Sequence, residues 1–196
     1  MISISHQYIF IHITKCGGTT IEDTLLDDSC ILRKNSFPHN WKVSYPLNHL
    51  TLDDIQKSKI IHTNFNEFYS FTFVRNPFDR LVSQFFYLKP RLKLSDDIKG
   101  GLIYLSNYSD QGIMGNHCMS QHKFINDQIN YIGRFENLQQ DFNIVCDKIG
   151  ISQQELPHKN KSNHKHYSEY YDDETLEIVA EKYAKDIEYF GYEFGE

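Results

Sequence analysis

The sequence predicts an α/β fold, with a central, mainly parallel sheet flanked by helices. Short apolar runs rich in β-branched and aromatic residues alternate along the 196 residues with segments whose apolar residues repeat at helical spacing. Strands that alternate with helices are typical of parallel sheets, because each helix then connects two strands that run in the same direction. The length is that of one domain, so we expect a single domain over residues 1–196.

The first third of the chain contains several predicted elements. Residues 8–13 are expected to form a buried strand, since so short an apolar run with β-branched and aromatic members does not make a helix. A helix is predicted over 19–26. Residues 29–48 contain two prolines and many polar side chains, which favours an irregular segment. A short helix over 51–57 and a short strand over 60–62 are expected to follow.

From residue 68 onward, strands and helices continue to alternate. Asn76 is a suitable N-cap, Pro77 fits the first helical position, and Pro90 is expected to end the helix that they begin. The other predicted elements are a strand over 68–74, helical pieces and loops over 91–125, a strand over 131–135, a helix over 138–149 and a last helix that contains Leu176 and Tyr183.

Composition and charge argue against several classes of function. The net charge of −6 gives no overall positive field that would attract nucleic acid or an anionic membrane. We therefore expect no nucleic-acid partner, no membrane anchor and a soluble, cytoplasmic protein. The cysteines have neither the spacing of a metal site nor that of a disulfide framework, and no metal is expected. They are Cys16, Cys30, Cys118 and Cys146.

The segment that directly follows the first predicted strand has the composition of a phosphate-binding loop. Gly17 and Gly18 allow the backbone to bend sharply and to approach a ligand. Thr19 and Thr20 begin a predicted helix, whose N–H groups and positive dipole end favour an anion. Lys15 adds a mobile positive charge. Because this lysine precedes the glycines, the segment is not a Walker A loop, which ends in Gly-Lys-Ser/Thr.

A second candidate phosphate site follows the strand predicted over 68–74. Arg75 stands at the end of that strand, and Ser83 lies about two turns into the next helix. A guanidinium and a hydroxyl at those two places can reach the same phosphate. Two strand–loop–helix segments of this kind in one small protein indicate a ligand with two separate phosphate-type groups.

With these motifs, the chain resembles the sulfotransferases that use 3′-phosphoadenosine 5′-phosphosulfate (PAPS), and most of all their carbohydrate branch of Golgi-type, heparan-like enzymes. Lys15-Cys-Gly-Gly-Thr-Thr20 is similar to the 5′-phosphosulfate loop of that family, and Phe73-Val-Arg-Asn-Pro-Phe-Asp-Arg-Leu-Val-Ser83 is similar to its 3′-phosphate motif. Later landmarks of the branch resemble Gly133–Leu138, Leu156–Ser162 and Asp186–Phe194. The resemblance implies a P-loop-like, three-layer fold and sulfuryl transfer from PAPS to a hydroxyl of a carbohydrate or small glycan. PAP would be the product, and no metal would be required.

The resemblance also assigns site residues. It puts Lys15, Cys16, Gly17, Gly18, Thr19 and Thr20 around the 5′-phosphosulfate, Arg75 and Ser83 on the 3′-phosphate, and Asn160 and Ser162 beside the nucleotide. Cys16 departs from the family pattern, since relatives more often have threonine or serine there, and a hydroxyl contact would be lost. Golgi relatives carry a membrane anchor and stem, and we expect neither in this chain.

Transfer to a hydroxyl needs a general base, and histidine is the natural choice because its ordinary pKa lies near neutral pH. In this family a catalytic histidine or acid lies between the two phosphate motifs, which leaves His39, His49 and His62. His49 is the first candidate, because His49-Leu-Thr resembles the His-x-Thr segment of the branch. His62, after a short apolar run, is the second. Lys15 would stabilise the charge on the leaving phosphate oxygen.

Two other functions fit the same motifs. A nucleotide or small-molecule kinase also holds phosphate groups, although it needs magnesium and usually the Gly-Lys-Ser/Thr order. A nucleotide- or glycan-binding module could keep both loops without catalysis. Transfer from PAPS, activity with ATP and magnesium, or PAP binding without transfer would separate the three. No motif names the acceptor sugar or the oligomeric state.

Overall fold

A computed structural model gives the fold and describes residues 1–31, 49–58, 65–108, 115–157 and 165–196. The chain divides into two compact units, each built from two separate stretches of sequence. The first unit comprises Met1–Val74 and Lys123–Lys159, and the second comprises Arg75–His122 and Asn160–Glu196. The two predicted phosphate motifs therefore belong to different units.

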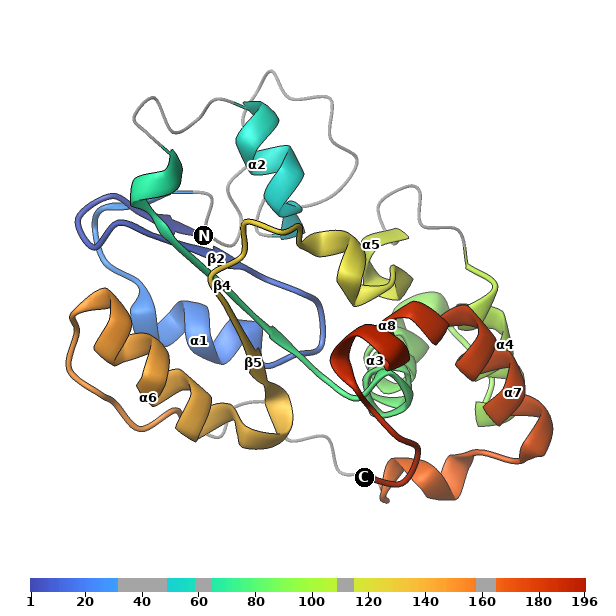
Figure 1. The fold of residues 1–196 in the computed structure, drawn as a ribbon. Coiled ribbons are helices and arrows are strands. Elements are labelled where there is room, and N and C mark those ends of the chain that lie inside the picture. Colours follow the sequence, from blue (N-terminus) through green and yellow to red (C-terminus); the bar gives the residue numbers. More distant parts are fainter. Residues whose placement is uncertain (32–48, 59–64, 109–114, 158–164) are drawn as a thin grey trace. The chain divides into compact units, whose positions relative to one another are not determined.

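The first unit contains a mixed five-stranded sheet with the order β3-β1-β2-β4-β5 (Figure 1). Its strands are β1 (Ile2–Ser3), β2 (Tyr8–Ile11), β3 (Cys30–Ile31), β4 (Tyr69–Val74) and β5 (Tyr131–Arg134). β2, β4 and β5 are parallel, whereas the two-residue strands β1 and β3 pair antiparallel. The predicted α/β class and the parallel pairing of the longer strands are confirmed. The antiparallel edge is an addition, and β3 lies in the segment predicted to be irregular.

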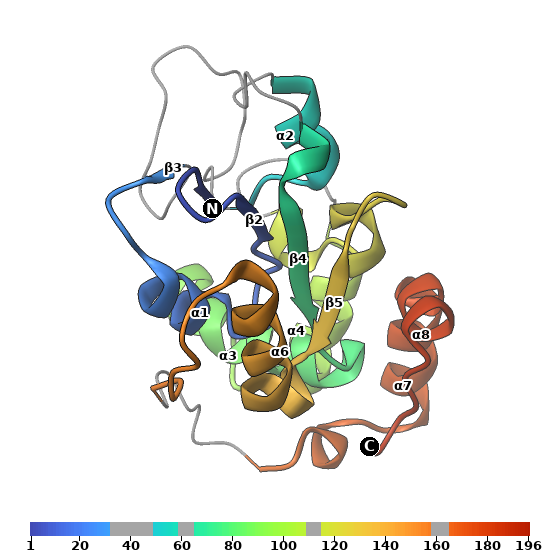
Figure 2. The same ribbon diagram turned by 60° about the vertical axis from the view of Figure 1, so that its left-hand side comes forward.

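The helices of this unit are α1 (Gly18–Leu25), α2 (Leu52–Ser58) and α6 (Leu138–Ile149), with short 3-10 turns at Phe65–Glu67 and Phe135–Asn137. α1 and α6 lie on the same face of the sheet (Figure 2). Alternation along β2 turns Tyr8 and Phe10 toward that face. The Tyr8 hydroxyl donates to the Leu25 carbonyl at the end of α1 (3.0 Å), and the Phe10 ring stacks on Phe71 of β4 with centroids 5.2 Å apart.

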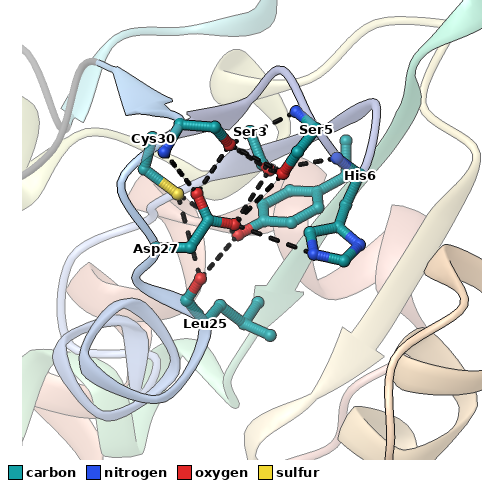
Figure 3. A network of polar contacts seen from close by, with 8 residues as sticks. Ser3, Ser5, His6, Leu25, Asp27 and Cys30 are labelled. Atoms are coloured by element: carbon teal, nitrogen blue, oxygen red, sulfur yellow. Dashed lines mark hydrogen bonds and ion pairs between the residues drawn. The ribbon is translucent and has the colours of Figure 1, made fainter.

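Polar contacts hold the C-terminal end of α1 near the turn between β1 and β2 (Figure 3). The Asp27 carboxylate accepts from the backbone N–H and the hydroxyl of Ser29, at 2.7 and 2.6 Å, and from the Ser3 hydroxyl at 3.3 Å. The hydrogen bonds from Ser29 are the main reason that the pKa of Asp27 is lowered. These contacts hold the C-terminal end of α1, and the other end of the same helix follows the candidate loop.

The second unit is helical. Its elements are α3 (Pro77–Leu92), α4 (Ile98–Ser106), α5 (Gly115–Cys118), a 3-10 turn at Tyr167–Tyr170, α7 (Asp173–Lys182) and α8 (Ala184–Phe190). One face of α3 supplies Leu81, Val82 and Phe85 to a core that Leu102 of α4 and Val179 of α7 complete. Burying each such side chain contributes about 1.5–3 kcal/mol, so this core holds α3 firmly. A further 3-10 turn, Gln121–Phe124, spans the boundary between the units.

The prediction that Pro90 ends its helix is wrong, because α3 continues to Leu92. A proline in the last turn removes only its own N–H from the helical hydrogen bonds. The next residues still bond, since the N–H groups of Lys93 and Leu94 both donate to the Lys89 carbonyl. The helix ends where Lys93 adopts a left-handed conformation, with φ 51°.

The predicted last helix is two helices, because Tyr183 leaves the helical conformation (φ −109°, ψ 20°) and separates α7 from α8. The strand predicted over 60–62 lies outside the described residues. Within the part of the chain that the structure describes, no helix combines the length and the apolar character that a membrane span requires. The same residues contain no cluster of metal-ligating side chains.

Candidate functional site

The loop after β2 has an unusual backbone. Lys15 and Gly17 both adopt left-handed conformations, with φ 65° and 79°. This conformation is easy for glycine but uncommon for lysine. Turns of this kind aim successive backbone N–H groups into a concavity that binds anions. Since β2 and β4 are parallel, with Ile11 opposite Thr72, the loop begins at the edge of the sheet where β4 ends.

The loop leads into the N-terminus of α1, with Gly17 as N-cap. The N–H groups of Thr20 and Ile21 donate to the Gly17 carbonyl, at 3.0 and 3.3 Å. Those of Gly18 and Thr19 stand at the first two helical positions, where a helix offers no carbonyl to accept them. They are therefore suited to an anion, which the positive end of the helix dipole also favours.

Gly18 is required by close packing, and Gly17 is favoured by its left-handed φ together with tight contacts. A Cβ on Gly17 would lie 3.0 Å from Leu138 Cδ2 and 3.3 Å from Phe135 Cδ2, in addition to the left-handed φ. A Cβ on Gly18 would lie 2.1 Å from Cδ2 of the buried His12 ring. From the sequence, the role of the two glycines was predicted to be a sharp bend and a close approach to a ligand. The structure adds that each of them also packs against a side chain behind the loop.

The other loop residues alternate in exposure. Lys15 and Thr19 are partly exposed, whereas Cys16 and Thr20 are buried. The Cys16 thiol points inward and donates to the Thr14 carbonyl at 3.5 Å. The residue that departs from the family pattern therefore offers a ligand its backbone rather than its side chain.

His49, the first candidate for the general base, is buried, and its Nδ1 lies 3.0 Å from the backbone oxygen of His12. A carbonyl can only accept, so Nδ1 carries the proton in this hydrogen bond. In the neutral ring the lone pair is then on Nε2, the atom that a base would use. His39 and His62 lie outside the described residues.

Two residues that the sequence did not single out lie beside His49. The Nδ1 atom of His12 is 3.1 Å from Oε1 of Glu22 in α1, and both side chains are buried. The His12 and His49 rings are 4.6 Å apart and nearly perpendicular. One signal was available, since His12 continues the alternation of Tyr8 and Phe10 toward the face that α1 covers.

In the second unit, Arg75 is buried and its guanidinium is held by Asp79 of α3. Nε and Nη2 of Arg75 lie 2.8 and 2.7 Å from the same carboxylate oxygen. The side chain of Gln121 binds the backbone N–H and carbonyl of Arg75. Ser83 is also buried, and its hydroxyl has no hydrogen-bond partner among the residues that the structure describes. Arg75 is thus positioned from two sides, by Asp79 and by Gln121.

The start of α3 is capped as predicted. The Asn76 side chain accepts from the Phe78 N–H at 3.1 Å, and its Nδ2 donates to the Glu193 carbonyl at 2.8 Å. One asparagine therefore begins the helix after Arg75 and also holds the C-terminal segment of the same unit.

A histidine–aspartate pair lies in the second unit, at positions for which the sequence predicted no role. Asp186 is completely buried, and its carboxylate accepts from the N–H of Gln121 (2.6 Å) and from the N–H and Nδ1 of His122 (2.9 and 2.6 Å). These bonds satisfy a buried charge. They also fix Gln121, the residue that holds Arg75. Asp186 begins a segment that resembles a family landmark, but its pairing with His122, 64 residues away, has no local sequence signal.

Asn160 and Ser162, predicted beside the nucleotide, lie outside the described residues. For the remaining predicted residues, the structure groups Lys15, Cys16, Gly17, Gly18, Thr19, Thr20 and His49 in the first unit and Arg75 and Ser83 in the second.

The sequence model of the sulfotransferase family matches residues 1–193, which include both units. The chain therefore belongs to the sulfotransferase family, and the expected transferase class is confirmed. Comparisons with curated proteins and with solved structures found no similar protein. The carbohydrate branch, the sulfuryl donor and the acceptor remain predictions.

Proposed function

We propose that the protein transfers a sulfuryl group from PAPS to a hydroxyl of a carbohydrate or small glycan. Membership of the sulfotransferase family supports sulfuryl transfer. The observation that carries the choice of donor is the pair of anion-binding motifs. One is the left-handed turn at Lys15 and Gly17 before α1, and the other is Arg75, held by Asp79, with Ser83 in α3. PAPS carries a 5′-phosphosulfate and a 3′-phosphate, and so needs two such sites.

In this proposal the loop after β2 binds the 5′-phosphosulfate, as in a P-loop-like fold. The backbone N–H groups of Gly18 and Thr19 bind its oxygens, with Thr20 and Cys16 completing the loop. The Lys15 ammonium stabilises the charge that develops on the bridging phosphate oxygen as its bond to sulfur breaks. Fixed N–H groups and a positive charge of this kind lower the barrier because they need no reorganisation during the reaction.

The second unit supplies the contacts to the 3′-phosphate. Arg75 offers a guanidinium whose orientation Asp79 fixes, and Ser83 offers a hydroxyl. A guanidinium can make paired hydrogen bonds to phosphate, which a lysine cannot. Asn160 and Ser162 are proposed beside the nucleotide on the resemblance alone.

His49 is the proposed general base, with His62 as the second candidate. Its Nδ1–H group is used by the His12 carbonyl, so Nε2 can accept the proton of the acceptor hydroxyl. A positioned base typically contributes about 10²- to 10⁴-fold to the rate. The remaining part of the barrier is lowered by in-line alignment of the acceptor with the sulfur.

The test is transfer of labelled sulfate from PAPS to a panel of glycans, phenols and alkylamines, together with PAP binding by thermal shift. Transfer to glycans, and PAP binding that Lys15→Ala weakens, are expected. Transfer to phenols or amines instead of glycans would contradict the proposed acceptor class but support PAPS as the donor. Activity with ATP and magnesium but not PAPS would favour a kinase. PAP binding without transfer, unaffected by His49→Ala, would indicate a binding module. No PAP binding would overturn the donor.

A further inference from the structure

Two buried ionisable side chains lie behind the loop and have no part in the chemistry proposed above. His12 follows β2, and Glu22 lies in the second turn of α1. The side chains are only 6% and 4% exposed, and His12 Nδ1 is 3.1 Å from Glu22 Oε1. Both side chains are held away from water, and charges in the protein interior interact more strongly than charges at the surface.

The Glu22 carboxylate is incompletely satisfied. Apart from the His12 ring, which is close but poorly aligned for a hydrogen bond, neither of its oxygens has a partner among the described residues. Burying a carboxylate without a full set of hydrogen bonds is destabilising. An apolar side chain at position 22 would be less destabilising. The buried carboxylate is therefore best explained by an interaction of its negative charge with a second group besides His12.

That second group is His49. The carbonyl of His12 accepts from His49 Nδ1 at 3.0 Å, and the two rings are in contact at 4.6 Å. The His12 ring also fills the space above Gly18, at the start of α1. His12 therefore contacts the carboxylate, the candidate base and the phosphate-binding end of the helix.

We propose that Glu22 and His12 are positioning residues for sulfuryl transfer, which hold His49 with its proton on Nδ1 and stabilise the positive charge that it gains. This inference rests on the proposed function. In the transfer step the acceptor oxygen bonds to sulfur, and its proton moves to Nε2 of His49. The bond from sulfur to the bridging phosphate oxygen breaks, and PAP leaves with that electron pair. His49 is then an imidazolium, which the nearby negative charge of Glu22 favours.

Other ionisable groups also act on this cluster. The α-amino group of Met1 is buried, which lowers its pKa to about 6, and the charges of Glu22 and Cys30 oppose that shift. Lys15 lies in the adjoining loop. The effect of a substitution at Glu22 must therefore be measured on the His49 ring itself, through its tautomer and its pKa.

NMR of the histidine rings in the full chain provides that readout. We expect the neutral His49 ring to carry its proton on Nδ1. Glu22→Gln should lower the pKa of His49 by at least about half a pH unit, because removal of a nearby negative charge disfavours the imidazolium. The matched control is Asp23→Asn, which removes the same charge from the next, exposed position of α1 and should shift it far less. A proton on Nε2, or equal shifts in both variants, would overturn the proposal.

Kinetics give a second readout once an acceptor is known. Glu22→Gln should reduce kcat roughly tenfold or more while KM for PAPS changes less than about threefold, and Glu22→Asp should recover part of the loss. An equal loss of kcat in Glu22→Gln, Glu22→Asp and the control Asp23→Asn, or no loss in any of them, would contradict the proposed role. If PAP binds but no acceptor is sulfated, the proposed function fails. The NMR measurements then still show whether Glu22 and His12 act on His49. If Glu22→Gln does not fold, Glu22→Asp takes its place in the NMR comparison: it moves the charge away from His12 and should lower the pKa of His49 more than Asp23→Asn does.

Discussion

Gln121 holds both backbone polar groups of Arg75. Its Oε1 accepts the Arg75 N–H at 2.9 Å, and its Nε2 donates to the Arg75 carbonyl at 2.8 Å. The N–H of Gln121 itself donates to the buried carboxylate of Asp186 at 2.6 Å. The backbone from which the candidate phosphate-binding guanidinium extends is therefore fixed by residues distant in the sequence. This relationship can be tested through the 3′-phosphate.

Gln121→Ala should weaken binding of PAP more than binding of 5′-AMP, which has no 3′-phosphate. The loss of two hydrogen bonds to Arg75 removes about 1–3 kcal/mol of support, so PAP affinity should fall roughly fivefold or more. Calorimetric titration with both nucleotides measures the difference. Gln153→Ala, at an exposed position that bonds Asp147, is the control and should leave both affinities unchanged. Equal weakening of PAP and 5′-AMP would argue against the role of Arg75.

Ser83→Ala should have a similar selective effect, since it removes a proposed direct contact to the 3′-phosphate. A neutral hydroxyl that donates to a phosphate contributes more than an ordinary hydrogen bond, and PAP affinity should fall roughly five- to thirtyfold. Stability should change little, because the Ser83 hydroxyl has no partner among the described residues. Ser106→Ala is a matched control in α4, since the Ser106 hydroxyl donates to the Leu102 carbonyl. Unchanged PAP affinity in Ser83→Ala would remove Ser83 from the proposed site.

Gly18→Ala should destabilise the protein by roughly 1–3 kcal/mol, because the new methyl group overlaps the His12 ring. Moving the ring is costly, because it is buried beside Glu22 and His49. In the double variant with His12→Ala, the added methyl group no longer meets the ring. The loss of stability in the double variant should therefore be smaller than the sum of the losses in the two single variants. Urea unfolding of the four proteins measures this coupling. Additive losses would show that the two residues do not press on each other.

Asp172 provides a prediction for pH. It pairs with Lys99 and caps α7 in a capping box with Thr175, and these contacts hold its pKa well below the usual value. A carboxyl whose pKa is lowered in the folded state stabilises that state above its ordinary pKa of about 3.8, and the contribution is lost as the pH falls further. Asp172→Asn should therefore lower Tm at pH 7. The difference from the unaltered protein should shrink below about pH 4, and a difference independent of pH would be contrary to this account.

The elements with strong local signals could be predicted from the sequence. β4 is aromatic or β-branched at every position except Ser70, and α3 begins after Asn76 with Pro77, as expected. β1 and β3 escaped prediction because two-residue strands have no periodicity, and they exist only by pairing with neighbours. The extent of α3 past Pro90 depends on packing and capping further along the chain, which local propensity does not contain.

The candidate site was predictable only in part. Lys15, Gly17, Gly18, Arg75 and Ser83 were recognisable because they form two contiguous motifs. The residues that position them were not, because Gln121, Asp186 and Glu22 act across long sequence separations through buried polar contacts. Spacing in a single sequence carries no information about such pairs.

The left-handed backbone at Lys15 has a consequence for how this loop would change under different selections. Glycine adopts φ 65° without strain, whereas a lysine there is roughly 1 kcal/mol less favourable. A library randomised at position 15 and sorted by heat resistance alone should therefore accumulate glycine. The same library sorted by PAP capture should return lysine. Lysine at position 15 therefore indicates selection for ligand binding rather than for thermal stability.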